Sequence, residues 1–414
     1  MSRQCRDLSA VLLGISISKG VTTPVKEKDS SELREDYIVD VASERVYVNQ
    51  DKAYHEAFTK WRNNKKNRYG YRFVHDTREH TYVDGEGYAD RRSENEERSS
   101  LRYCFAFLGT SMLMLFLFNQ IQFMLMRMLF GVKTVEWTYV SELDSAAPIT
   151  LNEVLVSCGF KIFTLLVILL LYVFFIHLPL NVSFPSSKLS PKFFLYAFNA
   201  SLIMAVILHL FDRVVTATAT DLGIDISYYA LPVTDSASCF VVSVLCNMLV
   251  IPIMSELLFR GCILQLFRQY GDRFAILVAS FASACCYHDI TKFLYVFCWS
   301  VILSIITIKS GSIIPALVIK ITGDSLIIML NTLLTNEKTV YADLLESVIC
   351  LSVIIVCISL MFIMRIKMMR PFKIEPDRTA LPLSQKLREV LNSPWSVIWL
   401  TVTLLTTILT LEVK

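Results

Sequence analysis

Ser255-Glu256-Leu257-Leu258-Phe259-Arg260-Gly261 closes an apolar run that begins at Cys239, and this stretch determines what kind of protein the chain forms. Ionisable side chains inside a membrane segment are expensive, so they are normally paired, face a protein interior and serve a function. The four-residue spacing of Glu256 and Arg260 puts both on one helix face, where the guanidinium can hold the carboxylate. The stretch therefore predicts a membrane helix that carries a buried ion pair.

The composition of the whole chain also indicates a membrane protein. Of its 414 residues, 54% are hydrophobic, and the mean hydropathy is +0.50. Apolar runs long enough to cross about 30 Å of hydrocarbon recur from Leu101 onward. We expect them at 103–130, 160–180, 193–211, 237–267, 274–290, 293–309, 312–334, 345–366 and 395–412. The predicted fold class is all-α, a polytopic membrane helical bundle of about eight or nine spans, in which the short pair 274–290 and 293–309 either crosses or dips in and returns.

Residues 1–100 differ in composition from the rest of the chain. They carry 18 Lys or Arg against 18 Asp or Glu, so this region is highly charged but neutral overall. We expect a mostly non-membrane, partly disordered or small adaptor-like region that can bind a protein partner. His55, His75 and His80 lie in it without the spacing of metal ligands.

The charges of the connecting loops predict an orientation. Loops on the cytosolic side of a membrane carry an excess of Lys and Arg. The loops 131–159, 212–236 and 335–345 are acidic, whereas 181–192, 268–273 and 365–388 carry basic residues. We therefore expect an integral membrane protein with a cytosolic N-terminus, surrounded by the lipid bilayer. Its formal net charge of only +3 gives no reason to expect a nucleic-acid partner.

Two later apolar segments carry further ionisable residues, His288 in one and Lys320 with Asp324 in the other. At 1.5 Å per residue, Glu256 lies roughly 18 Å from the basic end of its span, His288 roughly 24 Å and Lys320 and Asp324 roughly 14 and 20 Å. These depths agree within a turn or two, so the sequence predicts that the five residues can meet in one layer. Each also has a purely structural interpretation. The pairs Glu256–Arg260 and Lys320–Asp324 can be ion pairs that only stabilise the helices, and His288 beside Asp289 can be a residue at the membrane interface. His209, at the end of the third span, reads as interfacial and is not assigned to the site.

Three ordered blocks resemble the CAAX prenyl protease and bacteriocin-processing family, the type II CAAX proteases. Ser255–Gly261 resembles the Glu-Glu-x-x-x-Arg motif of that family, and Ala279–His288 is similar to its Phe-x-x-x-His motif. Lys309–Leu317 looks like the Thr-Gly-Ser-Ile-x-Pro-Ala stretch that leads into a His-x-x-x-Asn motif. The resemblance covers about 236–334 and identifies this part as a protease-like core between membrane helices at 101–235 and 335–414.

The resemblance implies an intramembrane endopeptidase in which Glu256 and His288 activate a water molecule. Arg260 would orient Glu256, and the third-motif residues would stabilise the oxyanion. At those positions this chain has Lys320 and Asp324 in place of histidine and asparagine, and Ser255 replaces the first glutamate. A lysine can stabilise an oxyanion, but an aspartate one turn away competes for the ammonium group. The expected substrate is a membrane-associated or prenylated peptide. No cofactor is expected, and a divalent metal only through the family resemblance.

Three functions stay open at this point. The first is the endopeptidase, and the second is a catalytically degenerate relative that acts as a membrane scaffold or binds peptides. The third is a transporter with an ion site, although no internal repeat supports it. The sequence has no HExxH motif, no GxSxG motif and no pair of aspartates in membrane segments, so zincin, serine hydrolase and aspartyl protease chemistry lack their residues. A Lys320 ammonium facing the cavity favours an enzyme, whereas one turned onto Asp324 and away from the cavity favours a scaffold.

Overall fold

The computed structural model describes residues 52–64, 66–71, 81–83, 87–89, 91–130, 148–221, 234–288, 290–336, 340–363, 374 and 381–409. Several sequence-based expectations lie outside these residues: His75, His80, Asp289, residues 1–51 and large parts of the acidic and basic loops.

The described chain is almost entirely helical, which confirms the predicted fold class. One small exception is an antiparallel pair of strands, β1 (Thr81–Val83) and β2 (Gly87–Ala89), with Tyr82 opposite Tyr88. The helices are α3 (Lys52–Arg62), α4 (Arg91–Phe130), α5 (Leu151–Ile176), α6 (Leu180–Ser183), α7 (Pro191–Asp221), α8 (Ala237–Leu245), α9 (Ile251–Glu256), α10 (Leu264–Phe267), α11 (Asp272–Cys285), α12 (Ile290–Ser310), α13 (Ile314–Asn336), α14 (Val340–Ile363), α15 (Leu383–Leu391) and α16 (Pro394–Leu409).

Seven of the described helical stretches are long and apolar enough to cross a membrane. They are Glu94–Phe130, Leu151–Ile176, Pro191–Ala219, Ala237–Tyr270, Lys292–Ser310, Ile314–Thr332 and Tyr341–Ile363. The other two expected spans are shorter helices. α16 has 16 residues, and α11, expected to run to residue 290, has 14 and ends at Cys285. At 1.5 Å per residue α11 is roughly 21 Å long, too short to cross alone, which disfavours the first of the two alternatives for this pair, that both segments cross.

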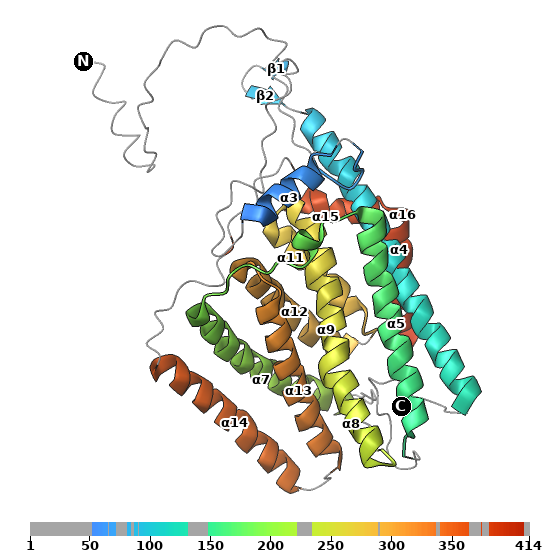
Figure 1. Cartoon of the computed structure of the whole chain (residues 1–414), viewed down its shortest axis with the longest axis vertical. Coiled ribbons are helices and arrows are strands. Elements are labelled where there is room, and N and C mark those ends of the chain that lie inside the picture. Colours follow the sequence, from blue (N-terminus) through green and yellow to red (C-terminus); the bar gives the residue numbers. More distant parts are fainter. Residues whose placement is uncertain are drawn as a thin grey trace.

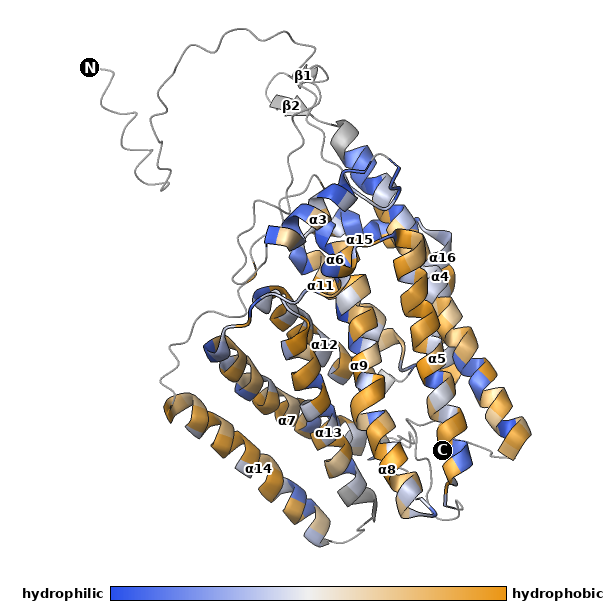
Figure 2. Cartoon of the chain, viewed as in Figure 1, coloured by the Kyte–Doolittle hydropathy of each residue, from blue (hydrophilic) through white to orange (hydrophobic). Residues whose placement is uncertain are grey.

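The long helices run side by side (Figure 1). From right to left α4, α5, the α8–α10 stretch, α13, α7 and α14 follow one another across the molecule (Figure 1), and hydrophobic residues make up most of their length (Figure 2). α4 packs against α5 and α16, whereas α7 packs against α12, α13 and α14. α11 packs mainly on α12.

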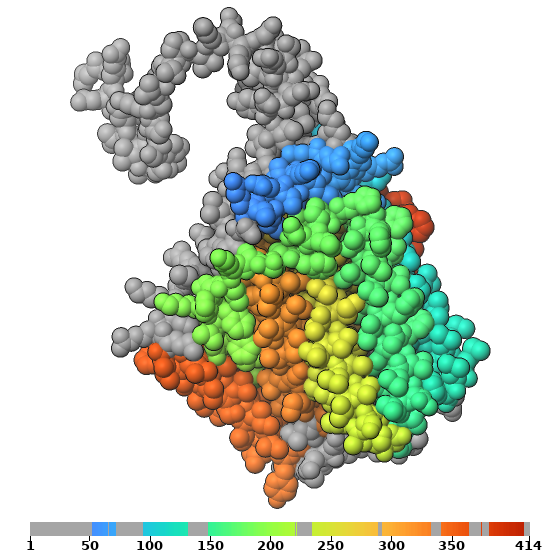
Figure 3. Space-filling model, in the orientation of Figure 1, coloured from blue at the N-terminus to red at the C-terminus, as the bar shows by residue number. Residues whose placement is uncertain are grey.

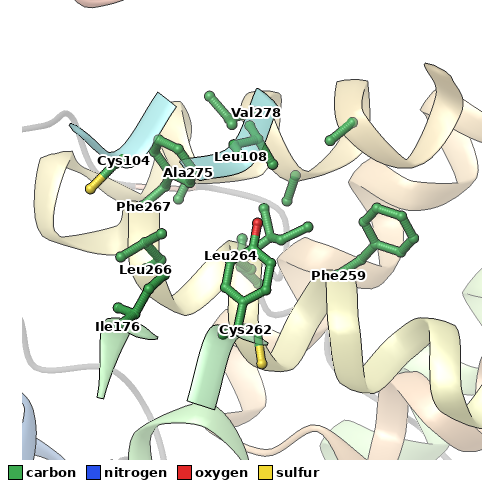
Figure 4. Close-up of a cluster of buried hydrophobic side chains, with 14 of the residues drawn as sticks. Cys104, Leu108, Ile176, Phe259, Cys262, Leu264, Leu266, Phe267, Ala275 and Val278 are labelled. Atoms are coloured by element: carbon green, nitrogen blue, oxygen red, sulfur yellow. The ribbon is translucent and has the colours of Figure 1, made fainter. Parts of the chain in front are cut away.

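The main core lies near the end of the bundle where α4 begins, and Figure 4 shows part of it. Phe105 of α4 contacts Phe267 with ring centroids 5.2 Å apart, and both rings also contact Phe274. α16 approaches α4 closely because Gly109 has no side chain: a Cβ there would lie 2.5 Å from the backbone of Trp395. Small residues permit such close approach of membrane helices, where lipid provides little hydrophobic driving force between helices.

Residues 52–71 fold onto this end of the bundle, which the expectation of a partly disordered region did not anticipate. Three contacts anchor them. The Tyr54 hydroxyl donates to Gln265 Oε1 (2.7 Å), the Trp61 indole donates to the carbonyl of Ile176 (3.0 Å), and the Tyr71 N–H donates to Gln269 Oε1 (2.8 Å). Figure 3 shows this segment in blue above the membrane helices. Residues 1–100 are highly charged but neutral overall, and this composition does not predict that single aromatic residues anchor part of the region to the bundle.

Candidate functional site

Glu256 lies in the long helical run Ala237–Tyr270, at the junction of two kinds of helix. α9 ends at Glu256 and is flanked by two π-helical turns, Cys246–Val250 and Leu257–Ile263. Pro252 stands at the start of α9 and has no N–H for the usual helical bond, so the backbone around it must find another arrangement. π-Helical turns are rare in proteins overall, and many of those that do occur lie at functional sites.

The Glu256–Arg260 pair is fully inside the protein. Glu256 is 0% exposed and Arg260 2%, and Arg260 Nη1 lies 2.8 Å from Glu256 Oε1. The other end of the guanidinium is fixed by α12, because Arg260 Nη2 donates to Ser300 Oγ (2.8 Å) and to the Ser300 carbonyl (3.3 Å). A buried charge without its partner is strongly destabilising, so the pair must form together. Arg260 therefore holds the carboxylate in one orientation.

Lys320 and Asp324 form a second i,i+4 pair, on α13. Lys320 Nζ lies 2.8 Å from Asp324 Oδ2, and the Trp299 indole donates to Asp324 Oδ1 at 3.2 Å. Gly323 makes room for this indole, because a Cβ at position 323 would lie 2.6 Å from the Trp299 ring. Trp299 and Asp324 thus fix the position from which the Lys320 ammonium acts.

His288 follows α11 in a strained backbone conformation. Its φ is 51°, in the left-handed region that few residues other than glycine adopt. Its N–H donates to the carbonyl of Cys285 at 3.4 Å, and its ring meets the edge of Phe116 from α4 with centroids 5.2 Å apart. Strain of this type costs on the order of 1–3 kcal/mol and tends to cluster at active sites.

All five sequence-predicted residues line one cavity of about 220 Å³: Glu256, Arg260, His288, Lys320 and Asp324. The helical run Ala237–Tyr270, the end of α11 and α13 contribute these five residues, and α4, α5 and α16 line the rest of the wall. Lys320 is paired with Asp324, and both residues line the cavity, so the pairing does not take Lys320 away from the cavity and does not by itself separate an enzyme from a scaffold. The structure brings the five residues to one space, while their chemical roles stay a prediction.

Residues 237–326 match one protein family. It is the Rce1-like family, described as type II CAAX prenyl endopeptidase Rce1-like. This match confirms the resemblance drawn from the three motifs, and Glu256, His288 and Lys320 with Asp324 all fall inside it. No curated protein and no solved structure matches the chain.

The Rce1-like match and the seven apolar helices together identify an integral membrane protein whose central part is CAAX-protease-like. The matched residues form α8 to α12 and the first half of α13, which are the elements that carry the ion pairs and His288.

Much of the cavity wall comes from outside the Rce1-like residues, and sequence reasoning did not identify it. α4 contributes Asn119 and Gln120, α5 contributes Lys161 and Thr164, and α16 contributes Thr406. Lys161 carried a usable signal, because it is an ionisable residue within the apolar run 160–180. The amides of α4 gave no such signal, since polar uncharged residues are tolerated at many positions of a membrane helix.

The cavity does not fit the divalent metal that the family resemblance allowed. Among the described residues, no three His, Cys, Asp or Glu side chains form a group that could hold a metal ion. The two carboxylates of the cavity each face a cation, Glu256 facing Arg260 and Asp324 facing Lys320. We therefore derive no step through a metal.

A second buried charge cluster lies between α7 and α14, and it corrects the interpretation of His209. His209 is 1% exposed rather than interfacial, and its Nε2 lies 2.6 Å from Glu346 Oε1. Arg213 lies between Glu346 (3.6 Å) and Asp343 (3.2 Å). Nearby, Lys292 of α12 pairs with Asp212 of α7. None of these residues is among those that line the cavity.

Proposed function

We propose that this protein is an intramembrane endopeptidase that hydrolyses membrane-associated or lipidated peptides with a water molecule activated by Glu256 and His288. The observation that carries the proposal is the common cavity: an oriented carboxylate, an imidazole and an ammonium group face the same space inside a CAAX-protease-like core.

Glu256 is the proposed general base. Arg260 orients it, and within the described part of the chain neither carboxylate oxygen accepts a hydrogen bond of good geometry. Both oxygens are buried, and we propose that a water molecule from the cavity binds to this carboxylate when the substrate is cleaved. General base catalysis from a positioned carboxylate typically contributes on the order of 10²–10⁴ in rate.

His288 is the proposed proton donor to the leaving amine. Histidine changes its charge near neutral pH and serves as acid or base with small changes in environment. The left-handed backbone at His288 directs the side chain away from the helix that precedes it, and Phe116 supports one face of the ring.

Lys320 is the proposed oxyanion donor. An ammonium group has three N–H donors, and the contact with Asp324 Oδ2 uses one of them. Because Trp299 also holds Asp324, the carboxylate acts as an anchor that positions the ammonium rather than as a free competitor. One preorganised donor of this kind is worth on the order of 10²–10³ in rate.

The alternative is a catalytically degenerate scaffold that binds such peptides without cutting them. The same Lys320–Asp324 distance favours it, because a lysine that is fully neutralised is a weak oxyanion donor. Under either function we propose that the N-terminus is cytosolic, that 236–334 is the functional core, and that residues 1–100 contact a partner protein.

The test is proteolysis in reconstituted vesicles. The wild-type chain and Glu256→Gln are compared on prenylated and leader-type peptides, with Glu346→Gln as the control for a buried glutamate outside the cavity. We expect cleavage by the wild type and by Glu346→Gln, and at least about 10² slower cleavage by Glu256→Gln. The endopeptidase proposal would be rejected in favour of the scaffold if the wild type bound the peptides without cleaving them and the double variant Lys320→His with Asp324→Asn gained activity.

A further inference from the structure

α15 (Leu383–Leu391) has its burial pattern reversed. A helix at a protein surface normally turns its apolar stripe inward and its charged residues outward. In α15 the charged residues Lys386 and Glu389 are each 1% exposed, whereas Leu383, Leu387 and Leu391 are 40%, 43% and 68% exposed. The three leucines recur every four residues and therefore form one stripe.

The rest of the protein holds α15 in this reversed orientation. Lys386 donates to the carbonyl of Tyr270 and faces Glu97 at 3.7 Å. Glu389 accepts from Arg102 Nε at 2.6 Å and from Asn392 at 2.9 Å. Rotation of the helix to bury its leucines would break these bonds and separate two buried charges from their partners, so within the described part of the chain the leucine stripe stays on the outside.

The exposed surface of α15 has two sides. At about 100° per residue, Ser384 and Arg388 lie next to the leucine stripe and form a separate polar face; both are exposed. α15 therefore presents a charged face to the protein, an apolar face outward and a polar face beside it. This is the pattern of a helix that lies in the plane of a membrane surface, with its apolar side in the acyl chains and its polar side in water.

The apolar face of α15 continues into a membrane helix. α16 begins three residues after Leu391, and its first turn exposes Trp395 (51%) and Ile398 (46%). Tryptophan is enriched where a membrane meets water. α15 and the start of α16 lie at the end of the bundle that α3 covers (Figure 1). The exposed leucines of α15 and the exposed apolar residues of α16 thus follow one another along the chain, with only two residues between the two helices.

We propose that α15 is an interfacial helix whose leucine stripe inserts into the lipid bilayer that surrounds the bundle. The occupant of the stripe is lipid, because the surface it joins is the lipid-facing side of α16. Through Lys386 this helix is bonded to Tyr270, the end of the helical run that contains Glu256. α15 accordingly sets the level of the bilayer relative to the cavity, with Glu256 roughly 20 Å below Tyr270 along that run.

Spin labelling of the full chain in vesicles tests this proposal without any reference to activity. The label is attached to Leu387→Cys, on the leucine stripe, or to Arg388→Cys, its neighbour on the polar face. The unsubstituted protein, labelled in the same way, gives the signal that comes from the native cysteines. We expect the label at 387 to collide several-fold more with oxygen, which dissolves in the membrane, than with a water-soluble nickel chelate. The label at 388 should show the opposite preference.

Equal access of the chelate to both labels would overturn the proposal, because the stripe would then lie in water. Low access of both reagents to the label at 387 would also overturn it, since a protein rather than lipid would then cover the stripe. If Leu387→Cys does not fold, Leu383→Cys and Leu391→Cys report on the same stripe. The two should behave alike, with oxygen preferred over the chelate.

Discussion

Two clusters of buried charge lie in this membrane protein, and they are built differently. In the cavity cluster each pair lies within one helix at i,i+4: Glu256 with Arg260, and Lys320 with Asp324. In the α7–α14 cluster the partners come from different helices: His209 and Arg213 on α7 contact Glu346 and Asp343 on α14.

The difference explains why only the first cluster is a candidate active site. A pair within one helix neutralises its charges without an ionic partner on a second helix, even where, as here, neutral groups of α12 also bind one member of each pair, so both groups can line an open space. A pair between helices closes the space between them and holds them together. α14 needs such pairs between helices, because only 17% of an apolar 18-residue segment of this helix is buried inside the protein. Buried charge alone therefore does not identify a site; a cavity that the charge lines is also needed.

Loss of the α7–α14 cluster should affect stability most. Glu346→Ala removes the carboxylate shared by His209 and Arg213 and leaves a buried imidazole and a half-buried guanidinium without it. We expect a loss on the order of 3–5 kcal/mol in the free energy of unfolding, measured by denaturant titration in detergent micelles. The double variant His209→Leu with Glu346→Leu should recover part of this loss. A stable Glu346→Ala protein that has lost peptidase activity would break the comparison.

Lys320→Met should lower catalysis rather than stability, the reverse of what we expect for Glu346→Ala. We expect kcat for peptide cleavage to fall on the order of 10²–10³ with little change in KM, because the oxyanion donor acts only in the transition state. Lys320→Gln, which keeps an N–H donor, should fall less. Lys292→Met is the matched control: it removes a lysine paired with Asp212 outside the cavity and should lower the melting temperature but not kcat. An unchanged kcat in Lys320→Met would remove lysine from the proposed mechanism.

Gly323→Ala should have a smaller effect on both properties. The new Cβ would lie 2.6 Å from Trp299, so the indole that holds Asp324 must move. We expect a loss of about 1–3 kcal/mol in stability and a smaller fall in kcat than in Lys320→Met. The control is Gly159→Ala on α5, where a Cβ meets nothing within 4 Å and alanine should be neutral or stabilising. Equal effects of the two variants would mean that Trp299 adapts freely.

Loss of the Glu389 charge on α15 should have the smallest effect, and one that depends on pH. Burial raises the pKa of the Glu389 carboxyl, but hydrogen bonds from Arg102 and Asn392 and the charges of Arg102 and Arg98 outweigh it and lower the pKa below its usual 4.5. A lowered folded-state pKa stabilises the protein above the unfolded value, and this contribution is lost as the pH falls through the folded value. The melting temperature of the wild type minus that of Glu389→Gln should be constant at neutral pH and shrink below about pH 4.5. A difference that grows in acid would contradict this assignment.

The sequence predicted the membrane helices well because each is defined by its own length and composition. Seven of the nine apolar runs became long membrane helices. α11 differed because the chain turns after Cys285, with His288 in a left-handed conformation, and no glycine or proline marks this turn in the sequence. The order of the three motifs likewise identified the protease-like core, since motif spacing is a local property.

By itself the sequence determined which segments enter the membrane and that Glu256 with Arg260, and Lys320 with Asp324, can each pair within one helix. Both depend only on hydrophobicity and the helical repeat. Only the tertiary structure decided that Lys161 and Asn119 share the cavity with these pairs, that His209 is buried against Glu346, and that α15 turns its charges inward. Each of these joins residues far apart in the chain, and the way that helices pack against one another is not encoded in any single segment.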